Sequence, residues 1–178
     1  MTALQIRTVG VTDIQVHDIY LGLGSNLRRQ WHLSQACIAL RASLGPLRCS
    51  PVFESSAVGL EAPAFFNMVV QAQTTRSLAS LVAELKALEG HFGRCRQTPE
   101  QVSLDIDLLM YGEQVGQFGD LELPRPEILE QAFVLKPLAQ LAPTCRHPRN
   151  GQTFSELWNG FVVNAPLTAV ELSLPSLG

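Results

Sequence analysis

Two aspartates separated by one residue, Asp105 and Asp107, lie within a short apolar run. Residues i and i+2 of a β-strand point to the same face. The pattern therefore predicts a strand that buries Leu104, Ile106 and Leu108 and directs both carboxylates to the opposite face. Two like charges at this spacing repel each other unless a cation or a proton relieves them, and Mg²⁺ prefers such oxygen ligands. The pair indicates a metal site, with a solvated strand face as the alternative.

Apolar periodicity along the chain predicts three more strands and two helices. Short apolar runs indicate strands over residues 19–23, 47–55 and 65–75. Apolar residues at helical spacing from Ala36 to Leu44 predict one helix, which ends at Gly45-Pro46. The same spacing predicts a second helix over residues 77–92. The resulting order is strand, helix, strand, strand, helix, strand. This order predicts an α+β fold, a ferredoxin-like βαββαβ sandwich with C-terminal additions, whose mainly antiparallel sheet carries two helices on one face.

Two further patterns suggest a ligand. The strand predicted over residues 65–75 has one apolar face, and Phe65 and Asn67 lie on the other. An amide beside an aromatic ring can hydrogen-bond and stack a flat heterocycle, although surface packing is the alternative. The polar connection before the aspartates contains Arg94 and Arg96. Guanidinium groups near paired carboxylates are typical of phosphoryl-transfer sites, with a solvated loop as the alternative.

Composition limits the class of protein. The chain has 178 residues, of which 46% are hydrophobic and 16% charged, values that predict one globular domain. A net charge of −3 argues against sequence-independent binding to nucleic acid. The four cysteines are widely spaced, which favours reduced thiols in a cytosolic protein, although four cysteines can pair. No apolar run is long enough to span a membrane. We expect a cytoplasmic protein, monomeric or weakly homodimeric, without nucleic-acid or membrane partners.

The chain is expected to divide into an N-terminal extension (1–18), one domain (19–161) and a C-terminal tail (162–178). The extension either adds an edge strand or forms a loose arm. Pro124 and Pro126 argue against a regular central strand or a helix over residues 121–126, and Pro137 is expected to break an apolar segment. The tail shows little helical or strand pattern.

Taken together, seven motifs follow one another in a characteristic order. They are Tyr20-Leu21-Gly22-Leu23-Gly24-Ser25-Asn26-Leu27, the loop 55–59, Phe65-Phe66-Asn67, Glu89 followed by Gly93-Arg94-Cys95-Arg96, Leu104-Asp105-Ile106-Asp107, Leu123-Pro124-Arg125-Pro126, and Ala132-Phe133-Val134-Leu135-Lys136-Pro137-Leu138. Each motif alone is weak, but the ordered set resembles the 6-hydroxymethyl-7,8-dihydropterin pyrophosphokinase family of the folate pathway over about residues 19–160.

The resemblance implies an ATP-dependent diphosphokinase. The family transfers the β,γ-diphosphate of ATP to the hydroxymethyl group of a reduced pterin and leaves AMP. By resemblance, Asp105 and Asp107 would hold two Mg²⁺ ions against the triphosphate, and Arg94 and Arg96 would clamp its phosphates as catalytic residues. The implied nucleotide-binding residues are Glu89, Arg94, Arg96 and Arg125. The implied pterin-binding residues are Ser55, Ser56, Val58, Phe65, Asn67 and Phe133, with Phe65 and Phe133 enclosing the ring.

The sequence departs from the family pattern just before the aspartates. Residues 97–103 lack the usual Trp and Arg, and Val102 stands where that Arg is expected. The family's Pro-His-Pro element is Pro124-Arg125-Pro126 in this sequence, so Arg125 stands in place of the His. Gln131 stands in place of the Arg that the family carries just before Ala132. Arg125 can restore the missing positive charge from another direction. The alternative is a catalytically weakened paralogue that binds pterin or nucleotide as a regulatory module; a glycosyltransferase is a more distant third reading of the aspartate pair.

Overall fold

The computed structural model describes residues 14–57, 62–93 and 100–172. Its centre is a six-stranded sheet in which five strands follow the order β5-β1-β4-β3-β8 and β2 pairs with β4. All of these pairings are antiparallel. The strands are β1 (His17–Ser25), β2 (Arg48–Cys49), β3 (Val52–Ser55), β4 (Phe65–Thr74), β5 (Asp105–Tyr111) and β8 (Leu167–Val170).

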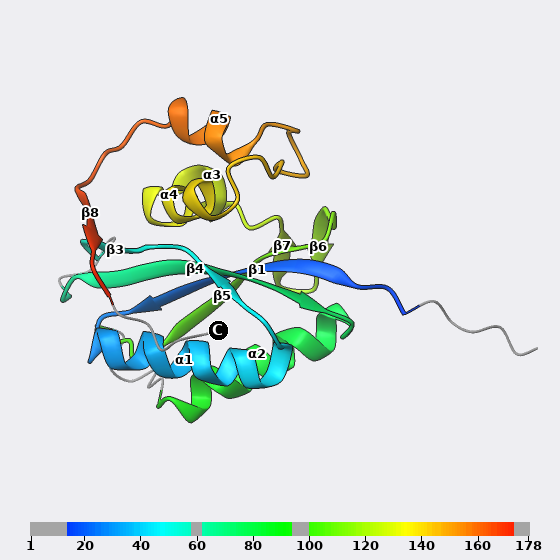
Figure 1. The fold of residues 1–178 in the computed structure, drawn as a ribbon, viewed down its shortest axis with the longest axis horizontal. Coiled ribbons are helices and arrows are strands. Elements are labelled where there is room, and N and C mark those ends of the chain that lie inside the picture. Colours follow the sequence, from blue (N-terminus) through cyan, green and yellow to red (C-terminus); the bar gives the residue numbers. More distant parts are fainter. Residues whose placement is uncertain (1–13, 58–61, 94–99, 173–178) are drawn as a thin grey trace, which may run out of the picture.

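The connections between the strands define the fold. Helix α1 (Arg29–Leu44) follows β1, and helix α2 (Leu78–His91) follows β4. Because β1 is antiparallel to both β4 and β5, those two strands run parallel with β1 between them, and α2 connects them. In the same way α1 connects the parallel strands β1 and β3 across β4. Both helices lie on one face of the sheet (Figure 1). These split βαβ units confirm the predicted ferredoxin-like fold.

A second helical layer covers the opposite face of the sheet (Figure 1). It contains α3 (Glu127–Glu130), α4 (Ala132–Leu141) and α5 (Phe154–Asn159). A hairpin of β6 (Gly116–Phe118) and β7 (Leu121–Leu123) lies between β5 and α3 in the chain. The sequence predicted only the first helical layer, because the order of elements does not show where C-terminal additions pack. The sheet is therefore buried on both faces.

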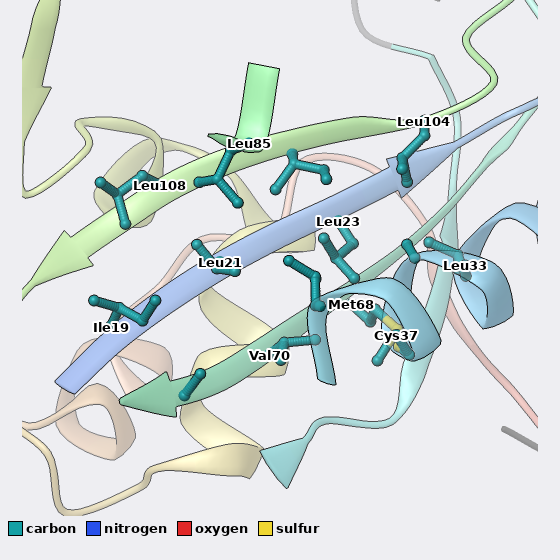
Figure 2. Close-up of a cluster of buried hydrophobic side chains, with 14 of the residues drawn as sticks. Ile19, Leu21, Leu23, Leu33, Cys37, Met68, Val70, Leu85, Leu104 and Leu108 are labelled. Atoms are coloured by element: carbon teal, nitrogen blue, oxygen red, sulfur yellow. The ribbon is translucent and has the colours of Figure 1, made fainter. Parts of the chain in front are cut away.

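The central strand β1 contributes to both cores. Its side chains on one face pack against residues of α1 and α2 (Figure 2). They are Ile19, Leu21 and Leu23. Tyr20 points the other way and packs edge-on against Phe154 of α5. The next two positions on that second face are Gly22 and Gly24. Leu109 of the second core packs over Gly22, and that core stops short of Gly24 near the end of β1.

Several local expectations are wrong. Helix α4 continues through Pro137, because the apolar side chains before and after this residue remain buried against the sheet. The tail contains β8, which pairs with the edge strand β3 and needs no apolar periodicity to do so. The strand expected over 47–55 is divided at Ser50-Pro51 into β2 and β3. The expectation of no central strand or helix over residues 121–126 agrees with the structure, in which the short strand β7 belongs to a separate two-stranded hairpin and ends just before Pro124, which lacks a backbone N–H.

The start of the sheet and the state of three cysteines are defined by the described residues. Strand β1 begins at His17, and residues 1–13 lie outside the described residues. Cys37, Cys49 and Cys145 carry free thiols, and Cys95 lies outside the described residues. Within the described ranges, no helix has the length and apolar character needed to cross a bilayer.

A buried asparagine fixes the segment that leads into the paired aspartates. The side chain of Asn26 donates a hydrogen bond to the carbonyl of Glu100 at 2.7 Å. It also accepts one from the N–H of Val102 at 2.7 Å. The backbone N–H of Asn26 donates to the carbonyl of Val102 at 3.0 Å. The end of β1 thus sets the position at which the chain enters β5.

We predict that Asn26→Ala lowers the free energy of unfolding by about 1–3 kcal/mol, because it leaves a backbone N–H and a carbonyl without their buried partner. Urea unfolding measures this change. Asn150→Ala is the matched control, since Asn150 makes its hydrogen bond at an exposed turn, and a change within about 0.5 kcal/mol is expected there. Equal effects of the two substitutions would contradict the role of Asn26.

Candidate active site

The paired aspartates lie on a strand, β5, as the sequence predicted. Strand β5 forms one edge of the sheet. Asp107 lies opposite Gly22 of β1, and Asp105 lies opposite Gly24. Gly24 in turn lies opposite Asn67 of β4. Leu104, Ile106 and Leu108 are buried in the first core, on the side of α1 and α2 (Figure 2). Alternation along β5 therefore turns both carboxylates toward the second face, beside the two glycines.

A pocket of about 240 Å³ lies over these glycines. Its lining includes Asn67, Asp105, Asp107, Glu127, Gln131 and Phe133. A Cβ atom added at Gly24 would lie 3.2 Å from Oδ1 of Asn67 and 3.8 Å from a ring carbon of Phe65. A side chain at position 24 would therefore occupy the space next to the Asn67 amide. The glycine floor suits a flat ring that approaches the backbone closely.

Two of the predicted pterin-binding residues, Asn67 and Phe133, line this pocket, and the ring of Phe65 lies next to Gly24 in its floor. The buried side chain of Asn67 donates a hydrogen bond to Oγ of Ser55 at 2.9 Å. Strand pairing places Ser55 opposite Phe65. Ser56 is exposed at the end of β3, and Val58 lies outside the described residues. The structure thus brings Ser55, Phe65, Asn67 and Phe133 to one end of the sheet.

A larger groove of about 1040 Å³ lies on the other side of the aspartates. Helix α2, strand β5 and the β6–β7 hairpin form its walls. Apolar side chains line part of it, and Glu89, Asp105, Asp107 and Arg125 line another part. The apolar residues include Leu78, Val82, Phe118 and Leu121. Both aspartates line the groove as well as the smaller pocket, so they stand where the two spaces meet.

The predicted nucleotide-binding residues have different surroundings. The carboxylate of Glu89 accepts a hydrogen bond from the N–H of Ile106 at 2.8 Å, which attaches α2 to the backbone between the two aspartates. Nη2 of Arg125 lies 3.3 Å from Oδ1 of Asp107 and 2.8 Å from Oε1 of Glu127. Arg94 and Arg96 lie outside the described residues.

The environment of Asp107 favours a cation. Burial, the charge of Asp105 and the carboxylates of Glu127 and Glu89 raise the pKa of Asp107 to about 6, although Arg125 opposes this shift. Among the described residues, no group of three or more His, Cys, Asp or Glu side chains is arranged to hold a metal. Mg²⁺ needs only one or two carboxylates when phosphate oxygens and water complete its coordination. The aspartate pair fits such an ion.

Two pairs of lining residues were not identified from the sequence as binding residues. Gly22 and Gly24 belong to the motif Tyr20–Leu27, and two glycines at positions i and i+2 of a strand indicate a face without side chains. Glu127 and Gln131 border the pocket because the chain turns back over the sheet after β7. No local pattern in the sequence reports that turn.

We predict that Asp107→Asn stabilises the protein at pH 8. The folded-state pKa of Asp107 is about 6, whereas an unfolded aspartate has a pKa of about 4. Folding therefore disfavours its ionised form, so its cost appears as the pH rises from about 4 to 6 and is complete above 6. Because the side chain is 45% exposed, screening reduces this cost to about 1 kcal/mol.

Urea unfolding of both proteins between pH 4 and pH 8 measures the effect. The Asn variant should be the more stable protein at pH 8, and its advantage should shrink toward zero at pH 4. An Asn variant that is no more stable at pH 8 would show that Asp107 is not destabilising.

Comparison with known proteins identifies the family. The sequence profile of 7,8-dihydro-6-hydroxymethylpterin-pyrophosphokinase matches residues 20–143. A 2-amino-4-hydroxy-6-hydroxymethyldihydropteridine pyrophosphokinase from Synechocystis sp. is 35% identical over 147 residues, which cover 80% of this chain and 75% of that protein. A protein of the same name from Pseudomonas aeruginosa is 34% identical over 149 residues, which cover 80% of this chain and 90% of that protein.

Solved structures agree with the fold. A triple mutant of HPPK-DHPS from Plasmodium falciparum superposes with a TM-score of 0.68 at 14% sequence identity. The match covers 82% of this chain but only 41% of that one, so the chain spans less than half of the Plasmodium protein. The family match over most of the sheet and both helical layers, together with relatives above 30% identity, shows that the chain belongs to the 7,8-dihydro-6-hydroxymethylpterin-pyrophosphokinase family.

Proposed function

We propose that this chain transfers diphosphate from ATP to the hydroxymethyl group of 6-hydroxymethyl-7,8-dihydropterin, giving AMP, with two Mg²⁺ ions held by Asp105 and Asp107. As a pyrophosphokinase of folate synthesis it is an ATP-dependent diphosphotransferase. One observation carries the proposal for the site: the two aspartates stand between a small pocket and a larger groove. An acceptor and a triphosphate can therefore meet at the carboxylates.

The small pocket suits the pterin. Its glycine floor allows a flat ring to lie on β1, and Asn67 offers both a donor and an acceptor at one edge. Phe65 and Phe133 provide aromatic surfaces, each worth roughly 0.5–1.5 kcal/mol as a stacking partner. Ser55 orients the Asn67 amide through their 2.9 Å hydrogen bond. We assign supporting contacts to Ser56 and Val58 from the family resemblance alone.

The groove suits ATP. Its apolar part can take the base, and the part near Asp105 and Asp107 can take the phosphates. Arg125 offers guanidinium donors there, and we assign Arg94 and Arg96 the same role from the resemblance. Glu89 shapes the groove by attaching α2 to β5. When bound, Mg²⁺ offsets phosphate charge and lowers the pKa of the attacking hydroxyl.

The residues of the chain then contribute mainly by position. The pocket directs the pterin hydroxymethyl group toward the aspartates, and the groove directs the β-phosphorus toward the same point. Holding both reactants in line converts a bimolecular reaction into an effectively unimolecular one. Val102, which replaces an arginine of the family pattern, is held by Asn26 and contributes no charge. Arg125 therefore supplies positive charge from the β7–α3 connection instead.

Some expectations remain predictions. The cytoplasmic location, the monomeric or weakly homodimeric state, and the lack of nucleic-acid and membrane partners follow from composition alone. The comparisons give no support to the alternative of a weakened, ligand-binding paralogue, since the matching relatives of similar length are named as pyrophosphokinases.

We predict that Asp105→Ala and Asp107→Ala each reduce the formation of AMP from ATP and hydroxymethyl-dihydropterin by a factor on the order of 10³ or more, because the charge that balances the triphosphate is lost. Chromatographic quantification of AMP in the presence of Mg²⁺ measures the rate. Asp18→Ala is the control, since Asp18 lies at the far end of β1 and its carboxylate accepts a hydrogen bond from the exposed side chain of Gln73. Near-normal turnover in either aspartate variant would remove the metal assignment.

We predict that Gly24→Val raises the Kd for the pterin by about 10- to 100-fold. The new side chain overlaps the ring site, and this steric overlap makes the binding free energy less favourable by about 1–3 kcal/mol. Isothermal titration calorimetry with the pterin measures this change. Gly90→Ala is the control, because no heavy atom lies within 4 Å of a Cβ at that position. Unchanged pterin affinity in Gly24→Val would place the pterin elsewhere.

A further inference from the structure

Arg125 makes an unusual set of contacts for a residue expected to bind phosphate. Its Nη2 atom contacts the metal-binding candidate Asp107 at 3.3 Å and Glu127 at 2.8 Å. Its side chain is only 25% exposed. The buried Nε of Arg125 and Oε2 of Glu127 have no hydrogen-bond partner within the described part of the structure. The guanidinium is therefore held by two carboxylates but is not fully satisfied by them.

The contact with Asp107 opposes metal binding. A guanidinium at 3.3 Å from a carboxylate oxygen repels a divalent cation that approaches the same carboxylate. The partly buried setting weakens solvent screening of this repulsion. Free Mg²⁺ must therefore displace Arg125 from Asp107 or bind next to its positive charge. An ion that arrives with a triphosphate also brings phosphate oxygens, to which the guanidinium can bind instead of Asp107.

The contact with Glu127 can hold the guanidinium of Arg125 in place when Arg125 gives up its contact with Asp107. It is the shorter of the two contacts. The backbone N–H of Arg125 also donates to the carbonyl of Leu109 at 2.9 Å, which fixes the base of the side chain against β5. Arg125 lines the large groove, and Glu127 lines the small pocket. A short side-chain movement can therefore carry the guanidinium from Asp107 toward the groove.

We propose that Arg125 is the resident counter-ion of Asp107 in the empty protein and transfers to the triphosphate when the Mg²⁺-nucleotide complex binds, with Glu127 as its fixed partner. The inference rests on the proposed assignment of the groove to ATP. It makes Arg125 a positioning residue with two alternate anionic partners. Its consequence is that the empty site binds a bare divalent ion weakly and the metal–nucleotide complex well.

The test is the substitution Arg125→Gln, with two binding measurements that need neither pterin nor turnover. The first is the affinity of the nucleotide-free protein for Mn²⁺, measured by electron paramagnetic resonance. We expect it to rise by about tenfold or more, because a positive charge next to the ligand is removed. The second is the affinity for the Mg²⁺ complex of α,β-methylene-ATP, measured by calorimetry, which we expect to fall by about tenfold because a charged phosphate contact is lost.

Matched variants separate this effect from general ones. Arg149→Gln changes the net charge equally but removes an exposed pair with Glu122, so both affinities should stay within about twofold of wild type. In an Asp107→Ala background, Arg125→Gln should give no gain in Mn²⁺ affinity. Arg125→Met keeps the aliphatic stem and replaces the Gln variant if circular dichroism shows that variant to be unfolded.

Opposite changes in the two affinities support the counter-ion role. An unchanged or reduced Mn²⁺ affinity in folded Arg125→Gln and Arg125→Met overturns it. A gain in Mn²⁺ affinity without a loss of nucleotide affinity overturns the transfer to phosphate. Failure of the proposed function is separate, since it appears as absent AMP formation by the wild-type protein with ATP and pterin.

Discussion

Electrostatic repulsion between Asp105 and Asp107 is the constraint on which the site depends. Strand alternation turns both carboxylates to one face of the sheet edge, and partial burial raises the pKa of Asp107 to about 6. Such a pair is stable only with positive charge nearby. Arg125 provides that charge in the described structure, and the proposed function adds metal ions at the same place. The groups around Asp105 and Asp107 are therefore arranged to balance the negative charge of these two carboxylates.

The rest of the fold brings two ligand spaces to this charge. Glycines replace side chains on the second face of β1, so the second core ends before the aspartates and a pocket remains. Helix α2 and the β6–β7 hairpin form the groove on the other side. Asn26 fixes the entry of the chain into β5. Packing of two helical layers against one sheet therefore determines where the pocket and the groove meet.

The core fold could be predicted from the sequence because alternation and helical spacing are local. The carboxylate face of β5 and the Asn67 site followed from the same period-two pattern. The second helical layer, the strand β8 and the continuation of α4 through Pro137 could not be predicted, because each depends on packing between distant segments. The pairing of Arg125 with Asp107 and Glu127 depends on the path of the chain after β7. The sequence indicated only that Arg125 can supply a missing charge.

The central claim is that the aspartate pair separates a pterin pocket from a nucleotide groove. A crystal structure with Mg²⁺, α,β-methylene-ATP and 6-hydroxymethyl-7,8-dihydropterin tests it most directly. The account predicts the pterin over Gly24 beside Asn67, the triphosphate in the groove lined by α2 and β7, and metal density on both aspartates. A pterin or triphosphate bound away from Asp105 and Asp107, or a complex without metal at these residues, would contradict it.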